Sequence, residues 1–228
     1  MKKKVVVISL GGSQIIPDKV GYSYLNSFKK VILKHKNEYN FVIVCGGGSL
    51  ARKYISAIER EDGSEYFQSL SGISATRANA RFVSYFFGMD AKRGIPKTKR
   101  TVRKYLNQQG IVFCGALEYV PEQTSDSVGA ELAEYFKGEF INLTNVNGLY
   151  TSDPKKNKNA KLVSQINWEN FNTIAEKTKY SPGQHFVLDQ RASELILKHK
   201  ISTYIIGKIS EFDKFLNKKK FIGTIIKG

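Results

Sequence analysis

The sequence predicts an α/β fold with a mainly parallel central sheet, and two sets of segments support this prediction. Short, β-branched and nearly continuous apolar runs, typical of strands buried on both faces, cover residues 5–10, 41–45, 111–114, 140–144 and 202–207. Helix-length segments with apolar residues three to four positions apart cover residues 24–35, 50–58, 73–87, 128–136 and 192–199. Strands that alternate with helices imply right-handed crossovers and parallel pairing.

The first apolar run, VVVISL at residues 5–10, follows three lysines and could imitate the core of a signal peptide. No small-residue cleavage site follows it, so a buried strand is the better interpretation. No run in the sequence approaches the roughly 18 uninterrupted apolar residues that a membrane helix needs. We therefore expect a cytoplasmic protein with no membrane partner.

The second and third runs each end in a cysteine, Cys45 and Cys114, and the sequence has no others. Cysteines in this position are typical of small buried hydrophobic residues rather than of a disulfide framework or a metal site. The histidines His35, His185 and His199 also lack the spacing of metal ligands. We therefore expect no metal site built from cysteines or histidines.

The last apolar segment, FIGTIIK at residues 221–227, could add a final edge strand. The chain has no internal repeat, low-complexity tract or Pro/Ser-rich linker, so we predict one domain over residues 1–228, with two lobes that meet near residues 115–121. A length of 228 residues with 41% hydrophobic residues is sufficient for a substantial core and excludes the disordered class.

The chain is strongly basic, with 36 Lys and Arg residues, 20 Asp and Glu residues and a formal net charge of +16. An anionic partner, such as a nucleotide or a nucleic acid, is therefore a candidate. The basic residues are mostly dispersed lysines, with higher density at residues 92–104 and 155–161. No RNP-like motif, zinc-finger spacing or basic zipper accompanies them, so we expect no specific nucleic-acid partner.

Glycine clusters follow three of the predicted strands, at residues 11–12, 46–48 and 115. Ligands of parallel sheets bind outside the carboxyl ends of the strands, where glycine lets a phosphate oxygen approach backbone N–H groups. A single such glycine often serves only a turn, but clusters at one sheet edge favour an anion site. Neither a Walker A sequence nor a true GxGxxG is present, which disfavours P-loop and dinucleotide-binding proteins.

Polar side chains at predicted helix starts have two interpretations. Ser49 is a candidate N-cap for the next helix, and the guanidinium of Arg52 could reach back to a phosphate. Thr124 and Ser125 are most simply N-caps, although their hydroxyls could equally bind an acceptor phosphate. Asp126 could orient a magnesium ion or a basic side chain, or could cap the helix.

Six motifs occur in order along nearly the whole chain: GGS, GGGSLARKY, SGISATRANA, TSDSV, TNVNGLYTSDPKK and a closing GT. Together they resemble the amino-acid-kinase superfamily and, within it, the archaeal type of uridylate (UMP) kinase. The resemblance implies a three-layer α/β/α sandwich, usually hexameric, that transfers the γ-phosphoryl group of ATP to UMP with Mg²⁺. An acceptor-binding lobe would span about residues 1–120 and an ATP-binding lobe about residues 121–228.

The resemblance also assigns roles to residues: Arg52, with Gly48, would contact the phosphates between the two nucleotides. We take Arg52 and Asp126 as the catalytic candidates. The ATP-binding residues would be Gly12, Ser13, Gly48, Arg52, Thr144, Tyr150 and Asp153. The ring of Tyr150 would pack against adenine, and Asp153 would accept hydrogen bonds from ribose or backbone donors. The UMP-binding residues would be Gly47, Ser69, Tyr119, Val120, Pro121, Glu122, Gln123, Thr124 and Ser125.

Three features depart from the family pattern. Ser9 stands where many members have a catalytic lysine in the first strand, so another cation must neutralise the transferred phosphoryl group. Ser69 stands where a UMP-binding aspartate is typical, which removes an acceptor for the ribose hydroxyls. The loop at residues 115–118 is longer than a compact Gly-Gly turn.

Two alternatives are compatible with these residues. One is another kinase of the superfamily that acts on a small phosphate, phosphonate or carboxylate; isopentenyl phosphate kinases have an active-site histidine, which residues 49–54 lack. The other is a non-catalytic nucleotide sensor or a nucleic-acid-binding regulator, suggested by Ser9, Ser69 and the net charge of +16.

Overall fold

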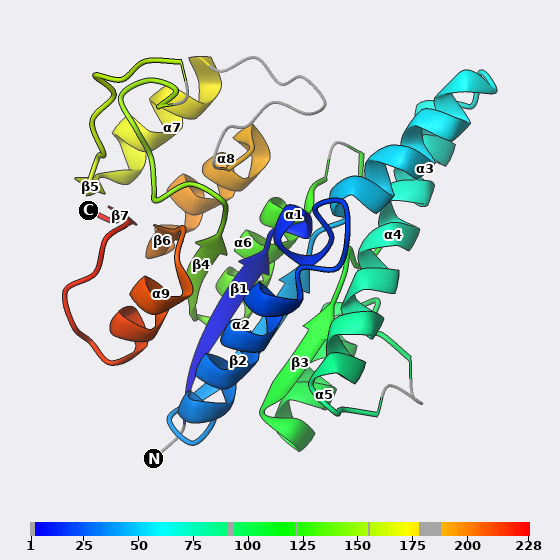
Figure 1. Ribbon diagram of the computed structural model, residues 1–228, viewed down its shortest axis with the longest axis horizontal. Helices are drawn as coiled ribbons and strands as arrows, with labels where there is room; N and C mark the ends of the chain where they lie inside the picture. The colour runs from blue at the N-terminus through cyan, green and yellow to red at the C-terminus, as the bar shows by residue number, and fades with distance from the viewer. Residues whose placement is uncertain (1–2, 91–93, 122, 155, 178–187) are drawn as a thin grey trace.

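The computed structural model describes residues 3–90, 94–121, 123–154, 156–177 and 188–228 (Figure 1). Its centre is a seven-stranded sheet with the order β3-β2-β1-β4-β6-β7-β5. The strands are β1 (Lys4–Leu10), β2 (Tyr39–Cys45), β3 (Ile111–Cys114), β4 (Glu139–Leu143), β5 (Gln165–Ile166), β6 (Thr203–Ile206) and β7 (Thr224–Ile226). Their pairings are parallel except that between β6 and β7. The predicted α/β fold with a mainly parallel sheet is confirmed.

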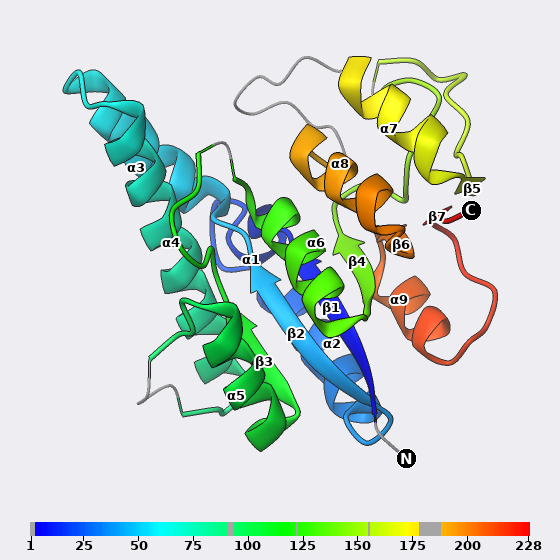
Figure 2. The ribbon, with the colours of Figure 1, turned by 180° about the vertical axis from the view of Figure 1, so that it is seen from behind.

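Helices cover both faces of this sheet. They are α1 (Gly12–Ile15), α2 (Tyr22–His35), α3 (Gly48–Arg60), α4 (Glu65–Phe86), α5 (Lys99–Gln109), α6 (Ser125–Phe136), α7 (Trp168–Lys177), α8 (Gln190–His199) and α9 (Ile209–Leu216). Buried side chains of α2, α4 and α9 pack on one face, and those of α5, α6 and α8 pack on the other, which faces the viewer in Figure 2. The three-layer sandwich that the resemblance implies is therefore confirmed.

Two predicted elements differ from the structure. The helix predicted at residues 73–87 begins at Glu65, because its first turns pack against α3 in a hairpin that projects beyond the sheet (Figure 1) and do not share the apolar spacing of the sheet-facing part. The last strand, β7, pairs with β6 but is not at the edge, since β5 pairs on its other side. A strand of two residues, as β5 is, is too short to produce a periodic pattern.

Helix α5 shows why some helices carried no clear apolar signal. Among its 11 residues only Val102 and Leu106 are buried. Its ends are marked instead by capping: the Thr98 side chain accepts a hydrogen bond from Thr101 N, and Gly110 takes the left-handed conformation with φ 72°. Such caps are visible in sequence, whereas a two-residue apolar face is not.

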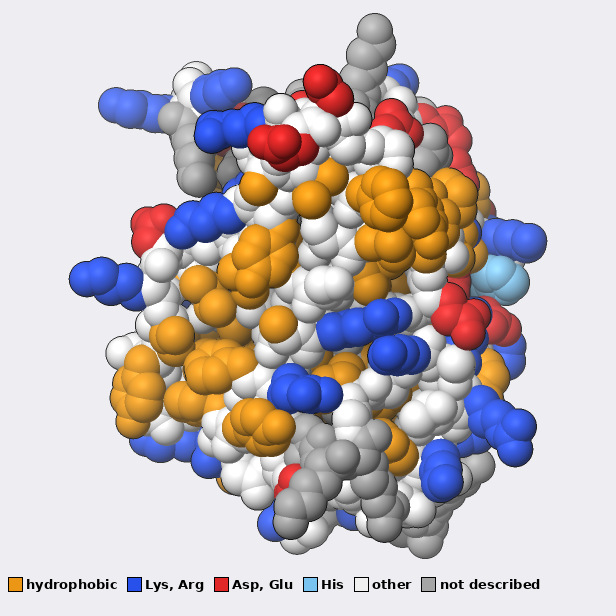
Figure 3. All heavy atoms as spheres, turned by 90° about the vertical axis from the view of Figure 1, so that its right-hand side faces the viewer, with side chains coloured by type: hydrophobic (Ala, Val, Ile, Leu, Met, Phe, Trp, Pro, Cys, Tyr) orange, Lys and Arg blue, Asp and Glu red, His pale blue; other side chains and the backbone are white. Residues whose placement is uncertain are grey.

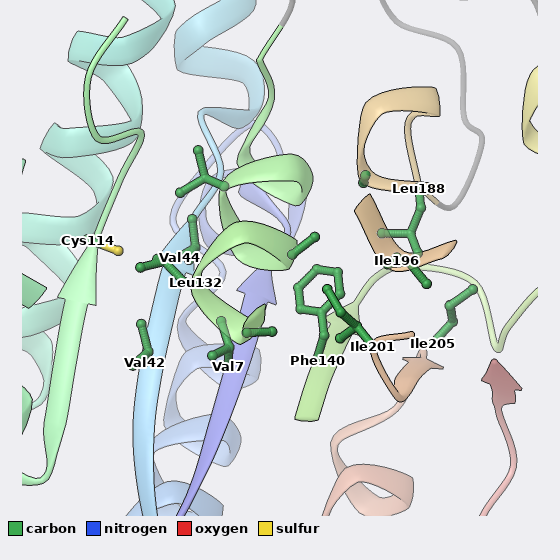
Figure 4. Close-up of a cluster of buried hydrophobic side chains, with 14 of the residues drawn as sticks. Val7, Val42, Val44, Cys114, Leu132, Phe140, Leu188, Ile196, Ile201 and Ile205 are labelled. Atoms are coloured by element: carbon green, nitrogen blue, oxygen red, sulfur yellow. The ribbon is translucent and has the colours of Figure 1, made fainter. Parts of the chain in front are cut away.

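The buried side chains form one cluster on each face of the sheet because neighbouring strand residues point to opposite faces. Figure 4 shows Val7 and Phe140 of the sheet beside Leu132 of α6 and Ile196 of α8. Each such side chain stabilises the fold by about 1.5–3 kcal/mol when fully buried. This packing holds the strand ends, and the loops that follow them, in fixed relative positions.

Both cysteines belong to these clusters, as predicted. Cys114 lies on the same face as Val44, its partner in the β2–β3 register, whereas Cys45 packs in the opposite cluster. Burial raises the pKa of the Cys114 thiol to about 12 and also raises that of Cys45. The two thiols are free, and they behave as small hydrophobic groups.

Lysine and arginine side chains are spread over the face shown in Figure 3, between hydrophobic and uncharged side chains. The high positive charge is therefore distributed on this face rather than gathered in one continuous stripe. No helix in the described part of the chain has the length and apolar character required to cross a membrane.

Candidate active site

The carboxyl ends of β1, β2, β3, β4 and β6 meet at one edge of the sheet. The chain moves from β1 to β2 and β3 on one side and then returns to β4 on the other side of β1. This reversal makes the ends of β1 and β4 a topological switch point, which is where ligands of open parallel sheets bind. Gly11 N donates to Leu143 O at 3.2 Å, and Gly46 N donates to Leu10 O at 2.9 Å, so the glycine clusters lie at this switch point as predicted.

The first two glycine clusters press directly against each other. A Cβ atom on Gly12 would lie 2.0 Å from Gly48 N, and one on Gly46 would lie 2.6 Å from Gly12 N. Gly48 also has φ 60°, a conformation that residues with a Cβ atom rarely adopt. Only glycine allows this approach, and it brings the backbone amides that begin α1 and α3 to one place, ready for an anion.

Ser49 is not the N-cap of α3, so that prediction is wrong. The N-cap is Gly47, and Ser49 Oγ instead donates to Ile16 O at 2.9 Å, which ties α3 to the residue that ends α1. Arg52 lies one turn into α3 with an exposed side chain, and none of the described residues forms an ion pair or hydrogen bond with it. Its guanidinium is available to a phosphate at the start of the helix.

Helix α4 holds two of the loops from the side. Asn79 Nδ2 donates to Gly46 O at 2.8 Å and to Gly47 O at 3.1 Å. Thr76 Oγ1 accepts from Ala116 N at 2.9 Å, at the start of residues 115–123, which we call the acceptor loop. Sequence reasoning assigned no role to Thr76 or Asn79, although both lie in the SGISATRANA motif.

The acceptor loop runs beside α4. The ring of Tyr119 meets that of Tyr66 edge to face at 4.9 Å, and Tyr119 is 36% exposed. Ser69 is half-buried one turn further along α4, on the side of the helix that carries Tyr66. Val120 is half-buried and Glu122 lies outside the described residues.

The far end of the acceptor loop is held by helices α6 and α8. Pro121 O accepts from Arg191 Nη1 at 3.1 Å, and Gln123 Nε2 donates to Glu131 Oε1 at 2.8 Å. Arg191 and Glu131 also approach each other at 3.9 Å. The loop is therefore fixed at both ends by side chains from three helices.

Thr124 is the N-cap of α6, so the capping interpretation is confirmed. Its hydroxyl accepts from Asp126 N at 3.1 Å and from Ser127 N at 3.3 Å, while Ser127 Oγ accepts from Thr124 N at 2.9 Å, which completes a capping box. The same hydroxyl donates to Oδ2 of Asp189. Ser125, the first residue of α6, is half-buried.

Two carboxyl groups, those of Asp126 and Asp189, interact near the start of α6. Asp126 accepts a hydrogen bond of 2.6 Å from Ser9 Oγ, and Asp189 caps α8 by accepting from Ala192 N at 2.9 Å. Burial, together with the charge of Asp189, raises the pKa of Asp126 to about 7, and the hydrogen bond from Ser9 opposes part of this shift. Asp189 was not predicted, because its place beside residue 124 depends on a contact across 65 residues.

The loop TNVNGLYTSDP begins where β4 ends. Thr144 N donates to Ile206 O at 3.1 Å, and Tyr150 forms a β-bridge with Leu162. Leu149 N donates to Thr224 Oγ1 at 2.8 Å, so the threonine of the closing GT motif supports this loop. Tyr150 is half-buried, whereas Asp153 is exposed in a turn.

This arrangement defines a class of protein: an α/β/α sandwich with paired glycine loops at one sheet edge. The model of the amino acid kinase family matches residues 4–207, and the chain belongs to this family. Within the family, it is similar to archaeal uridylate kinases. That of Thermococcus onnurineus is 33% identical over 223 residues, which cover 97% of this chain and 98% of the relative. That of Methanococcus aeolicus is 35% identical over 226 residues, with the same coverage.

A solved structure gives the same result. The uridylate kinase of Archaeoglobus fulgidus has a TM-score of 0.83 and 30% sequence identity, and the match covers 97% of this chain and 99% of that one. The UMP kinase of Ureaplasma parvum, at 21% identity and a TM-score of 0.81, shares the fold over the full length of both chains.

Proposed function

We propose that this chain transfers the γ-phosphoryl group of ATP to UMP, giving ADP and UDP. The observation that carries the proposal is the contact between the two glycine loops at the end of β1, where Gly12 and Gly48 leave no room for a Cβ atom. This contact would provide a backbone anion site between the acceptor loop on one side and the 144–153 loop on the other. The archaeal relatives named above are uridylate kinases, which supports UMP as the acceptor.

The two sides of the switch point would bind different nucleotides. On the donor side, the residues would be Gly12, Ser13, Gly48, Arg52, Thr144, Tyr150 and Asp153. On the acceptor side, they would be Gly47, Ser69 and residues 119–125. The acceptor-binding part would comprise about residues 1–120 and the ATP-binding part about residues 121–228. Thr124 would then act mainly through the loop, since its hydroxyl is occupied by the helix cap and Asp189.

Catalysis by this chain would depend on positioning and charge neutralisation. The phosphate of UMP is already anionic near neutral pH, so no strong general base is required. The backbone amides at the start of α3 and the guanidinium of Arg52 would stabilise charge that develops on the transferred group. Arg52 would thus supply the positive charge that Ser9 cannot.

The site also fits Mg²⁺, which would accompany ATP. Magnesium is usually held by one or two carboxylates together with substrate phosphates and water. Asp126 and Asp189 interact electrostatically near the start of α6, so their two carboxyl groups would be the protein ligands. No group of three or more acidic, His or Cys side chains with metal-site geometry occurs among the described residues. The ion would neutralise phosphate charge on the donor.

ADP release with a panel of acceptors tests the proposal. UMP, CMP, dUMP, AMP and isopentenyl phosphate are each supplied with ATP and Mg²⁺, and we expect UMP to give the highest kcat/KM. A higher value for a non-nucleotide acceptor would identify a different kinase of the family. Binding of ATP without turnover of any acceptor would indicate a nucleotide sensor instead.

The family resemblance also supports a homo-oligomer, which we propose to be a hexamer in the cytoplasm. Sedimentation of the purified protein over a range of concentrations measures its mass in solution. A monomer at all concentrations would exclude this assembly.

A further inference from the structure

One turn of α4, residues 76–79, contacts both the second glycine loop and the acceptor loop. Asn79 donates to the carbonyl oxygens of Gly46 and Gly47, at 2.8 Å and 3.1 Å. Three residues earlier, Thr76 Oγ1 accepts from Ala116 N at 2.9 Å. One helix turn therefore holds the backbone of two loops that follow different strands, β2 and β3.

Arg77 adds two more bonds to the acceptor loop. Its Nε donates to Ala116 O at 3.0 Å, and its Nη2 donates to Leu117 O. A guanidinium presents its donors in a rigid plane, so this pair of bonds fixes two consecutive carbonyl groups in position and orientation.

The environment of Arg77 is unusual for a charged residue. The side chain is half-buried, and none of the described carboxylates forms an ion pair with it. Burial lowers the pKa of its guanidinium. Partial burial of an arginine with only carbonyl partners has a desolvation cost, which a purely solvent-facing role would not require.

The start of the acceptor loop is also pressed against this turn. A Cβ atom on Gly115 would lie 2.5 Å from Thr76 Oγ1 and 2.6 Å from Arg77 N. The loop therefore leaves β3 in direct contact with α4, and the hydrogen bonds from Arg77 act on the next two residues of the chain.

We propose that Arg77 is a positioning residue for the acceptor nucleotide: it fixes the acceptor loop at Ala116 and Leu117 relative to the glycine loop held by Asn79. This inference rests on the proposed function, because it assumes that the acceptor loop contacts UMP. Helix α4 then sets the spacing between the amides that bind phosphate and the loop that binds the nucleoside. The 144–153 loop follows β4, which lies on the other side of β1 from β2 and β3. A change at Arg77 should therefore have little effect on ATP binding.

Hydrogen exchange of the protein without nucleotides tests, independently of activity, whether Arg77 fixes the acceptor loop. We compare the wild type with Arg77→Ala, Arg77→Lys and the control Arg81→Ala, since Arg81 is an exposed residue one turn further along α4. In Arg77→Ala the amides of residues 116–120 should exchange about tenfold faster, while those of β3 stay unchanged. Arg81→Ala should exchange like the wild type. Unchanged exchange of residues 116–120 in Arg77→Ala would overturn the proposal.

Steady-state kinetics of the same variants test the consequence for the acceptor. Arg77→Ala should raise the KM for UMP about tenfold and change the KM for ATP by less than about twofold. Equal increases in both KM values would show a general structural defect and overturn the proposal. Arg77→Lys keeps the charge but loses the planar fork, so both the fast exchange and part of the KM increase should persist. A wild-type KM in Arg77→Lys with fast loop exchange would show that charge alone matters, which also overturns it.

The two measurements separate this inference from the proposed function. If the wild type phosphorylates another acceptor but Arg77→Ala still loosens residues 116–120 and raises the KM for that acceptor alone, the positioning role stands and UMP is the wrong substrate. If the wild type phosphorylates UMP and Arg77→Ala changes neither measurement, the positioning role fails. Should Arg77→Ala not fold, Arg77→Lys provides the same comparison.

Discussion

Ser9 Oγ donates a hydrogen bond of 2.6 Å to Asp126 Oδ1 and so joins the end of β1 to the first turn of α6. A lysine at the position of Ser9 would place a positive charge beside this carboxyl group and lower its pKa. Serine offers only a neutral donor, and burial together with Asp189 raises the pKa of Asp126 to about 7. The replacement of lysine by serine therefore changes the charge balance at the centre of the proposed site.

The raised pKa of Asp126 predicts a pH-dependent stability. In the folded state, Asp126 binds a proton below about pH 7. In the unfolded state, it binds that proton only below its ordinary pKa of 3.8. Ionisation of Asp126 therefore lowers the stability of the fold as the pH rises from about 4 to above 7. Asp126→Asn should be more stable than the wild type at pH 8 by about 1–2 kcal/mol, less than the full shift implies because the carboxyl group is partly exposed. At pH 4 the advantage should vanish.

Denaturant unfolding at both pH values measures this difference. The exposed Asp18 offers a matched control, and Asp18→Asn should leave the difference between the two pH values unchanged. An Asp126→Asn variant with the same advantage at pH 4 and pH 8 would contradict the prediction.

Arg52→Ala should weaken catalysis without loss of stability. A guanidinium that faces phosphate stabilises developing charge, and its removal should cost about 2–4 kcal/mol of transition-state stabilisation. Arg52 is exposed on α3, so Tm should not change. Lys53→Ala, at the exposed neighbouring position, is the control and should retain kcat/KM. Unchanged kinetics in Arg52→Ala would place Arg52 on the solvated face of the helix.

Tyr150→Ala should raise the KM for ATP more than that for UMP, because the ring is assigned to the donor base. Tyr150 is half-buried and its backbone forms the bridge with Leu162, so removal of the ring should reduce stability only moderately. Tyr150→Phe keeps the ring and should keep the KM for ATP. Equal KM increases for both substrates, together with a large loss of Tm, would instead identify Tyr150 as a core aromatic residue.

Ser69→Asp should increase the preference for UMP over dUMP. A site built to bind a hydroxyl strongly rejects the deoxy analogue, and serine leaves the site without the carboxylate acceptor. The side chain of the neighbouring Gln68 is held by the segment before α4, since Nε2 donates to Gly63 O at 2.9 Å. The ratio of kcat/KM for UMP and dUMP measures the effect in both proteins. Strong ribose selectivity in the wild type that is unchanged in Ser69→Asp would show that Ser69 does not contact the ribose.

The sequence alone was sufficient to predict five of the strands, β1, β2, β3, β4 and β6, and the sheet edge that carries the proposed site. Strands such as β1 and β2 bury both faces, so their apolar composition is a local property that does not depend on the rest of the chain. The glycines at residues 12 and 48 also indicate the loops at this edge, because only glycine permits such a close backbone approach. The N-cap role of Thr124 also follows from local chemistry.

Only the tertiary structure decided which distant side chains complete the site. Asp189 reaches Thr124 across 65 residues, Asn79 reaches Gly46 across 33, and Arg77 reaches Ala116 across 39. Helix periodicity shows which side of α4 is apolar, but it does not show which loop a polar side chain on that helix will meet. The crossover from β3 back to β4 and the packing of α4 and α8 on opposite faces of the sheet determine the partners of these polar side chains. Such long-range contacts form only when the whole chain is folded.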